Sequence, residues 1–114
     1  MNNINRDSME KKTEICIYTI VPIFNSYEYL SNCIISVLNQ AESNIKLILV
    51  DDGSTDGSGE LCDNYARYDN RVSVIHQKNS GQIIARQEGL KYIKTYCTPK
   101  SCDIVMFLDS DDTF

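Results

Sequence analysis

The stretch Leu47-Ile48-Leu49-Val50-Asp51-Asp52-Gly53-Ser54 decides the fold, because an apolar run ends in two carboxylates and a turn. A short apolar run bounded by turn residues is typical of a strand buried in a parallel sheet. A second run has the same form: Ile104-Val105-Met106-Phe107-Leu108 precedes Asp109-Ser110-Asp111-Asp112. In open α/β sheets, ligands bind beyond the carboxyl ends of the strands. Because carboxylates that lie together repel, the clusters indicate a site for a hard cation and the polar edge of a ligand.

Strands and helices alternate along the rest of the chain. Apolar, β-branched runs predict strands at residues 15–24, 46–50, 72–76 and 103–108. Apolar residues at helical spacing predict helices at residues 27–39, 58–68 and 82–96. Asn25 and Ser26 are residue types favoured at a helix N-cap. The order βαβαβαβ predicts an α/β fold with a mainly parallel sheet and helices on its faces.

Size and charge restrict the classes of protein that the chain can represent. Its 114 residues make one small domain or part of a larger one, with a flexible polar tail at residues 1–14 and a domain at residues 15–114. A net charge of −5 argues against a non-specific nucleic-acid binder, although a bound cation would allow a nucleotide ligand. No apolar run approaches the ~20 residues of a membrane span, so we expect a cytoplasmic protein.

The five cysteines are odd in number and form no Cys-x-x-Cys pair. This pattern favours free thiols in a cytosolic protein. Cys97 and Cys102 are close enough in sequence to form a disulfide, but nothing requires one. A zinc site has too few clustered ligands, since His76 is the only histidine.

The carboxyl ends of the predicted strands carry no known phosphate-binding loop. Neither Gly-x-Gly-x-x-Gly nor the P-loop pattern is present, so a divalent metal held by carboxylates is the expected route to a phosphate group. Asp109-x-Asp111 would place two side chains on the same side of an extended segment, and Asp112 adds a third carboxylate. We therefore expect Mg²⁺ or Mn²⁺ there. Four glycines are expected in loops at this end of the sheet, namely Gly53, Gly57, Gly59 and Gly81, with Gly57 and Gly59 serving only as turn residues.

A set of short motifs, taken together, resembles the family 2 glycosyltransferases, which have a GT-A fold. Each motif is weak alone, but their order and spacing are those of the family from about Ile15 to the end of the chain. The matching segments are residues 20–25, 36–40, 50–56, 79–81, 85–86, 89–90 and 107–112. The sequence departs from the family pattern at Gln87, where Asn is common, and in residues 98–103 before the last strand. These departures affect loop details and not the class.

The resemblance implies a nucleotide-sugar site. Pro22 and Phe24 should line the base and ribose, and Asp52 should accept the imide N–H of uracil. Gly81 lies in a matched segment and should contact the nucleotide sugar. Arg86 should lie near the base or the diphosphate, because its guanidinium supplies several donors.

The second acidic cluster corresponds to the family's Asp-x-Asp motif. By this resemblance Asp109 and Asp111 belong to the nucleotide-sugar site, and Asp111 and Asp112 should contact the ribose and the metal. Without a ligand, Arg86 could instead form an ion pair with Asp51 or Asp52.

The resemblance also implies an activity and its partners. We expect an inverting, metal-dependent glycosyltransferase that moves a sugar from a UDP-linked donor to the hydroxyl of a glycan or lipid-linked acceptor. Nothing in the chain matches the family's general base, so the catalytic residue is expected beyond Phe114. The chain therefore looks truncated, and alone it should bind donor but transfer sugar poorly, because a general base contributes roughly 10²–10⁴-fold to the rate. A half-sheet with an uncovered edge could also self-associate.

Two other classes of protein remain open at this point. Val50-Asp51-Asp52 resembles the acidic pair of a signalling receiver domain, but a complete βα unit precedes it here and the later lysine of that family cannot be located. The chain could also be a non-catalytic module that binds only a nucleotide or a partner.

Overall fold

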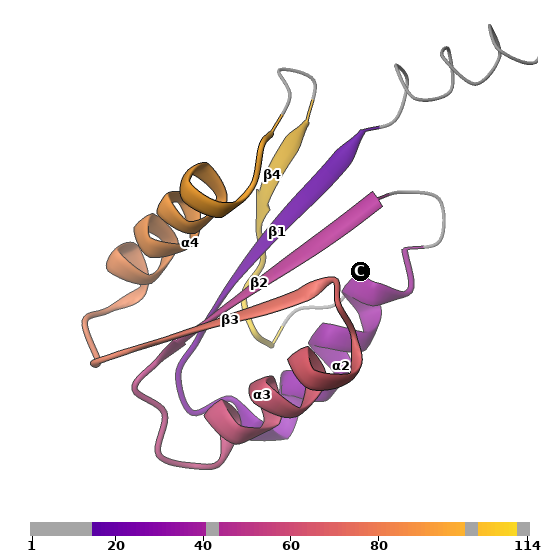
Figure 1. Cartoon of the computed structure of the whole chain (residues 1–114). Coiled ribbons are helices and arrows are strands. Elements are labelled where there is room, and N and C mark those ends of the chain that lie inside the picture. The colour runs from indigo at the N-terminus through magenta and orange to yellow at the C-terminus, as the bar shows by residue number, and fades with distance from the viewer. Residues whose placement is uncertain (1–14, 41–43, 100–102, 112–114) are drawn as a thin grey trace, which may run out of the picture.

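The computed structural model describes residues 15–40, 44–99 and 103–111, which form a four-stranded sheet with helices on both faces (Figure 1). The strands are β1 (Cys16–Ile23), β2 (Asn44–Asp52), β3 (Val72–Gln77) and β4 (Ile104–Phe107). Their order across the sheet is β3-β2-β1-β4, and every neighbouring pair is parallel. The helices are α2 (Tyr27–Leu38), α3 (Ser58–Tyr68) and α4 (Gln82–Tyr96). The predicted α/β fold with a parallel sheet is confirmed.

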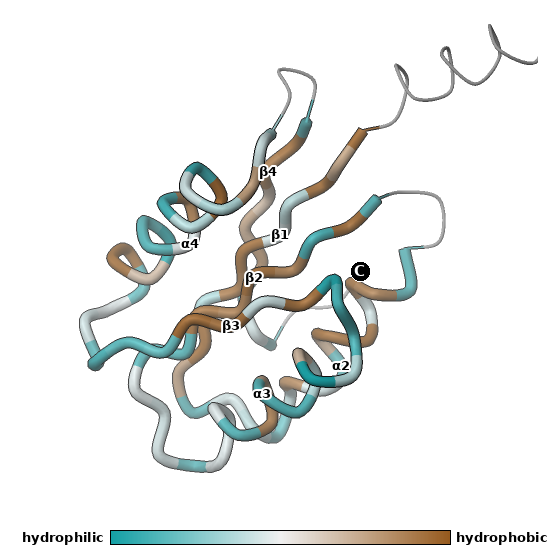
Figure 2. The backbone as a smooth tube through the Cα atoms, viewed as in Figure 1, coloured by the Kyte–Doolittle hydropathy of each residue, from teal (hydrophilic) through white to brown (hydrophobic). Residues whose placement is uncertain are grey.

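The sheet separates two apolar cores. One lies between the sheet and α2 and α3, where Leu30, Ile34 and Val37 from α2 meet Leu47 and Leu49 from β2. The other lies under α4 on the opposite face, as Figure 1 shows. Strands β1 and β2 contribute to both cores, because successive residues of a strand point to opposite faces. Figure 2 shows the brown, hydrophobic colour along much of both strands, with teal at the start of β2. The residues of both strands are buried toward their carboxyl ends.

All seven predicted elements are present, with bounds within two residues of the predicted ones. The helices α3 and α4 begin and end where the sequence predicts. On the apolar faces of these helices, Tyr65 and Leu90 pack partly buried against the two cores, and Ile93 is buried. Helical periodicity therefore identifies the inner faces of these helices correctly.

One prediction about the strands is wrong. The second apolar run was expected to be a buried strand, but Ile104, Val105 and Phe107 of β4 are between 39% and 44% exposed. Among the described residues β4 pairs only with β1, so it is an edge strand. An apolar run indicates that a strand will be buried, but it does not show whether the covering segment is present. The predicted uncovered edge is thus found at β4.

Several predictions fall outside the described residues. These are the tail at residues 1–14, Cys102 with its possible disulfide to Cys97, and the third carboxylate, Asp112. Within the described ranges no disulfide joins the cysteines, and no three His, Cys, Asp or Glu side chains gather closely enough to hold a metal ion. None of the helices in these ranges is both long and apolar enough to cross a membrane.

Candidate functional site

Asp52 lies at the carboxyl end of β2, and its carboxylate is buried and held by three donors. Oδ1 accepts from Gln77 Nε2 at 2.9 Å and from the Ser80 backbone N–H at 2.7 Å, while Oδ2 accepts from the Gly81 N–H at 3.0 Å. Burial alone would raise the pKa of Asp52, but the hydrogen bonds from Gln77, Ser80 and Gly81 outweigh it and leave the pKa below its ordinary value. Asp52 is therefore an ionised acceptor at neutral pH.

A cavity of about 420 Å³ opens beside this carboxylate, beyond the ends of β1 and β2. Four of the residues predicted for the nucleotide-sugar site line it together: Pro22, Phe24, Asp52 and Gly81. The cavity is also lined by residues that sequence reasoning missed, namely Ile23, Ser26, Asn79, Gln82 and Ser110. Each of these lies inside a matched motif or directly after one, so their position in the sequence relative to the motifs was the signal that could have identified them.

A second, more polar cavity of about 320 Å³ adjoins the first and shares Ser26, Gln82 and Ser110 with it. Asp109 and Asp111 line this cavity, so the structure brings both described carboxylates of the Asp-x-Asp segment to the same place. Carboxylate oxygens are the ligands that Mg²⁺ and Mn²⁺ prefer, so the donor set fits such an ion in type.

The segment that carries these carboxylates does not have the predicted backbone. β4 ends at Phe107, and Ser110 and Asp111 lie in a turn. The prediction that Asp109 and Asp111 share one side of an extended segment is therefore wrong. The Ser110 hydroxyl lies 2.6 Å from the Ser26 hydroxyl, and this contact fastens the turn to the loop after β1.

Arg86, on α4, lies beside the acidic turn. Its Nη2 atom is 3.5 Å from Asp109 Oδ1, and its guanidinium carbon lies 5.8 Å from the centre of the Phe107 ring. The alternative of an ion pair with Asp51 or Asp52 is therefore not observed. The Arg86 Nε atom is buried and has no hydrogen-bond partner among the described residues. A donor buried without an acceptor costs free energy, so a ligand oxygen would be stabilising there.

A loop of residues 53–57, which we term the supporting loop, packs against segments that line the larger cavity. The Asn25 N–H donates to Ser54 Oγ at 3.0 Å, and Asn25 Oδ1 accepts from the Thr55 N–H at 2.8 Å. A Cβ atom on Gly53 would lie 2.8 Å from the backbone nitrogen of Asn79, so the loop packs closely on that cavity residue. The supporting loop thus contacts two of the segments that line the cavity, the one after β1 and the one after β3.

The supporting loop also caps the N-terminus of α2. Ser26 occupies the N-cap position, but its side chain makes no capping hydrogen bond. The free N–H of Tyr27 instead donates to Asp56 Oδ2 at 3.1 Å, across 29 residues of sequence. The Asp56 Oδ1 atom accepts from both the backbone N–H and the hydroxyl of Ser58, at 3.0 and 2.6 Å. Asp56 therefore accepts hydrogen bonds from the first residues of both α2 and α3. The sequence did not predict this role, because the contact with Tyr27 is not local.

Gly59 was predicted to be a loop residue with a turn function, and this is wrong because it lies in the first turn of α3. A Cβ atom there would meet Asp51 Oδ2 at 2.6 Å. The missing side chain lets α3 approach the end of β2. Gly57, at φ +94°, is the turn residue that was expected.

With this geometry in place, comparison with known proteins decides the family. The family model for glycosyl transferase family 2 matches residues 18–114, which is most of the chain. The chain belongs to glycosyltransferase family 2. The receiver-domain alternative is therefore wrong, and the resemblance carried by the short motifs is confirmed.

Curated relatives of this family 2 chain are bacterial glycosyltransferases that are considerably longer. Glycosyltransferase GlyG of Streptococcus pneumoniae serotype 4 is 43% identical over 97 residues, which are 84% of this chain and 30% of that protein. The uncharacterized glycosyltransferase EpsJ of Bacillus subtilis is 43% identical over 94 residues, which are 82% of this chain and 25% of EpsJ. The chain thus spans less than a third of the length of either relative.

Solved structures support the fold. Residues 1–349 of S. aureus TarS in complex with UDP-GlcNAc superpose with a TM-score of 0.71 at 28% identity, covering 87% of this chain and 27% of that one. The same TarS segment in complex with UDP gives a TM-score of 0.70. The family 2 chain described here therefore has the GT-A-like architecture expected for its family.

Proposed function

We propose that this chain is the donor-binding part of a glycosyltransferase that takes a UDP-linked sugar. The observation that carries the proposal is the Asp52 carboxylate, which is buried, ionised and fixed at the wall of the larger cavity. An immobile anion at a strand end is suited to accept a hydrogen bond from the polar edge of a base. The UDP and UDP-GlcNAc complexes of TarS support the choice of uridine diphosphate.

Asp52 has capacity for one more donor. An ionised carboxylate offers about four lone-pair sites, and the Gln77, Ser80 and Gly81 donors use three. The remaining site belongs to Oδ2, which accepts only the Gly81 N–H, and it suits the imide N–H of uracil. Phe24, half exposed at the mouth of the same cavity, would pack against the base or ribose.

The smaller cavity would take the diphosphate. Asp109, Asp111 and, outside the described residues, Asp112 are the residues that would hold Mg²⁺ or Mn²⁺. When bound, such an ion would offset the charge of the departing diphosphate. Arg86 would move its charge from Asp109 toward the phosphate oxygens, which would also give its buried Nε atom an acceptor.

The acceptor side of the reaction lies outside this site. We propose inverting transfer to a hydroxyl of a glycan or lipid-linked acceptor in the cytoplasm, with a general base contributed from beyond Phe114. A non-catalytic module that only binds nucleotide would have the same donor site. Sugar transfer and UDP binding must therefore be measured separately.

Isothermal titration calorimetry with UDP, with and without Mn²⁺, tests the donor site. We expect Mn²⁺-dependent binding that Asp111→Ala weakens at least about tenfold, because the substitution removes a proposed metal ligand. Glu60→Ala is the matched control, since it removes the same charge from an exposed position on α3 outside both cavities. If UDP does not bind with Mn²⁺ and Asp111→Ala has no effect, the site assignment is wrong.

A further inference from the structure

The carboxyl ends of β2 and β3 form two side-chain pairs that point to opposite faces of the sheet. Asp52 is in register with Gln77, and the two are hydrogen-bonded on the side of the larger cavity. Asp51 is in register with His76, and Asp51 Oδ2 lies 2.9 Å from His76 Nδ1. Neighbouring residues of a strand alternate between faces, so the second pair lies behind the cavity wall. The proposed donor site does not use it.

His76 joins the sheet to α3. Its second ring nitrogen, Nε2, lies 2.8 Å from Oδ1 of Asp63 in the middle of α3. A carboxylate only accepts hydrogen bonds, so both contacts form together only when both ring nitrogens carry a proton. A neutral imidazole has one N–H and must lose one of the two hydrogen bonds. The arrangement therefore favours the imidazolium form of His76.

Asp51 extends this connection to the cavity. Its other oxygen, Oδ1, accepts from the Ser54 N–H at 3.0 Å and so fixes the start of the supporting loop. The Ser54 hydroxyl in turn accepts the N–H of Asn25, the residue that separates the cavity-lining Phe24 and Ser26. Four consecutive contacts thus run from Asp63 through His76, Asp51 and Ser54 to Asn25.

We propose that His76 is a positioning residue whose protonated form holds the supporting loop, and through it the cavity wall, so that UDP binding weakens when His76 loses its proton. The proposal rests on the donor site proposed above. His76 touches no part of that site itself and acts only through Asp51.

The two carboxylates around His76, Asp51 and Asp63, both raise its pKa. The hydrogen bond to Asp51 is the main reason that the pKa of His76 lies above its ordinary value of 6.5; partial burial opposes this shift and Asp63 adds to it. The Cys62 thiol of α3 interacts with both Asp51 and Asp63, and burial raises its pKa to about 12, so it stays neutral. Because the folded-state pKa of His76 is raised, its stabilising contribution is complete below about pH 6.5 and is lost as the pH rises through the folded-state pKa.

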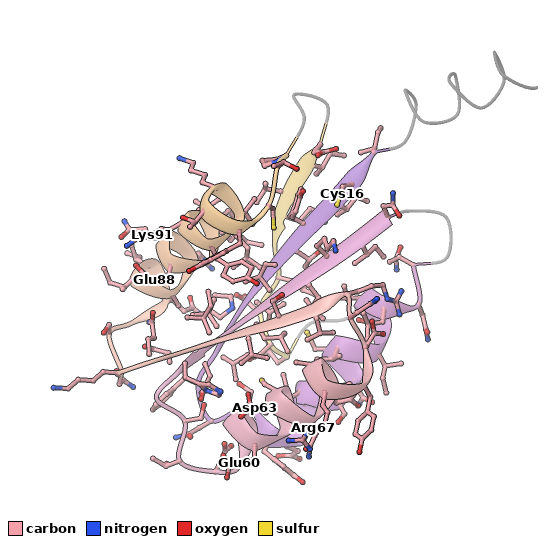
Figure 3. The ribbon with its side chains drawn as sticks, viewed as in Figure 1. Cys16, Glu60, Asp63, Arg67, Glu88 and Lys91 are labelled. Atoms are coloured by element: carbon pink, nitrogen blue, oxygen red, sulfur yellow. The ribbon has the colours of Figure 1, made fainter. Side chains whose placement is uncertain are left out.

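Nuclear magnetic resonance measures the first step, because His76 is the only histidine of the 114 residues and its imidazole signals need no assignment. We expect Asp63→Ala to lower the pKa of His76 toward 6.5. Glu60→Ala is the control, since it removes a carboxylate three residues earlier on the same helix, and Figure 3 labels both positions on α3. An unchanged His76 pKa in Asp63→Ala would overturn the proposal at this step.

Amide hydrogen exchange and UDP affinity measure the second step. At a pH between the His76 pKa values of the wild type and Asp63→Ala, we expect the Ser54 and Asn25 amides to exchange on the order of tenfold faster in Asp63→Ala. In the presence of Mn²⁺, UDP should bind about fivefold more tightly to the wild type than to His76→Gln at low pH, and equally at high pH. The UDP phosphate itself titrates near pH 6, so affinities are compared between variants at the same pH.

The outcomes separate the two proposals. A constant affinity ratio across the pH range, or exchange rates that do not follow the protonation of His76, would show that the histidine is only structural. If the wild type binds no UDP at any pH, the proposed donor site fails in this chain. The exchange rates of Ser54 and Asn25 then decide the inference about His76 without any ligand.

Discussion

The carboxyl ends of β2 and β4 both carry aspartates, but their surroundings differ. At the end of β2, Asp51 and Asp52 are about 95% buried, and groups of the protein itself hold both carboxylates in place. At the end of β4, the side chain of Asp109 is 51% exposed and has one ion pair at 3.5 Å. The first cluster is held in place by protein donors before a ligand binds, with one acceptor site of Asp52 still unused, whereas the second has few protein partners.

The difference follows from the position of each strand in the sheet. β2 is flanked by β1 and β3, so the loops after β2 and β3 can donate backbone N–H groups to its carboxylates. Within the described residues β4 lies at an edge, with Arg86 of α4 as the cation beside its end. We infer that the β2 end is pre-organised to recognise the base, while the β4 end gains most of its contacts when a ligand binds.

The largest effect on stability and on UDP binding is expected when the Asp52 carboxylate at the end of β2 is removed. Asp52→Ala leaves the Ser80 and Gly81 N–H groups and the Gln77 amide without their acceptor. A hydrogen bond to a charged group contributes about 1.5–3 kcal/mol, and water can replace part of the loss because Ser80 and Gly81 are exposed. For three lost hydrogen bonds the free energy of unfolding should therefore fall by about 3 kcal/mol. Urea unfolding measures this change, and calorimetry should show UDP binding lost.

Asp52→Asn is the matched variant for that experiment. It keeps the shape and one acceptor oxygen, so its loss of stability should be smaller while the negative charge is absent. Unfolding of Asp52→Ala at the wild-type urea concentration would contradict the idea that this carboxylate organises the loop after β3.

A smaller effect is expected when α3 is pushed away from the β2 end. Gly59→Ala places a Cβ atom 2.6 Å from Asp51 Oδ2, and such overpacking costs typically about 1–3 kcal/mol. Alanine gains up to about 1 kcal/mol of helix propensity over glycine, so we expect a net loss of about 1–2 kcal/mol.

A double-mutant cycle with Asp51→Ala isolates this contact. In the Asp51→Ala background the obstructing oxygen is gone, so Gly59→Ala should become neutral or stabilising. If the cost of Gly59→Ala is the same in both backgrounds, the crowding lies elsewhere.

The comparison also shows which structural features could be predicted from the sequence and which could not. Apolar runs and helical periodicity located the elements, because these patterns are local in the sequence. The apolar run of β2 pointed to Asp51 and Asp52 together, and the family resemblance selected Asp52 for the nucleotide site. The sequence did not predict the partners of Asp56 or His76, because these contacts join residues 13 to 29 positions apart. The turn at Ser110 was missed for a related reason, since its geometry depends on Ser26, 84 residues away.

The smallest effect on stability is expected at the β4 end. Asp109→Asn removes the ion pair with Arg86, but both side chains are more than a third exposed, and exposed pairs contribute about 0–1 kcal/mol. The free energy of unfolding should therefore change by less than about 0.5 kcal/mol, while the dependence of UDP binding on Mn²⁺ should weaken strongly. Urea unfolding and paired titrations with and without Mn²⁺ measure the two quantities, with Glu60→Ala as the control for a lost surface charge. A stability loss as large as that of Asp52→Ala would mean that the β4 end is structural and that its openness has no bearing on ligand binding.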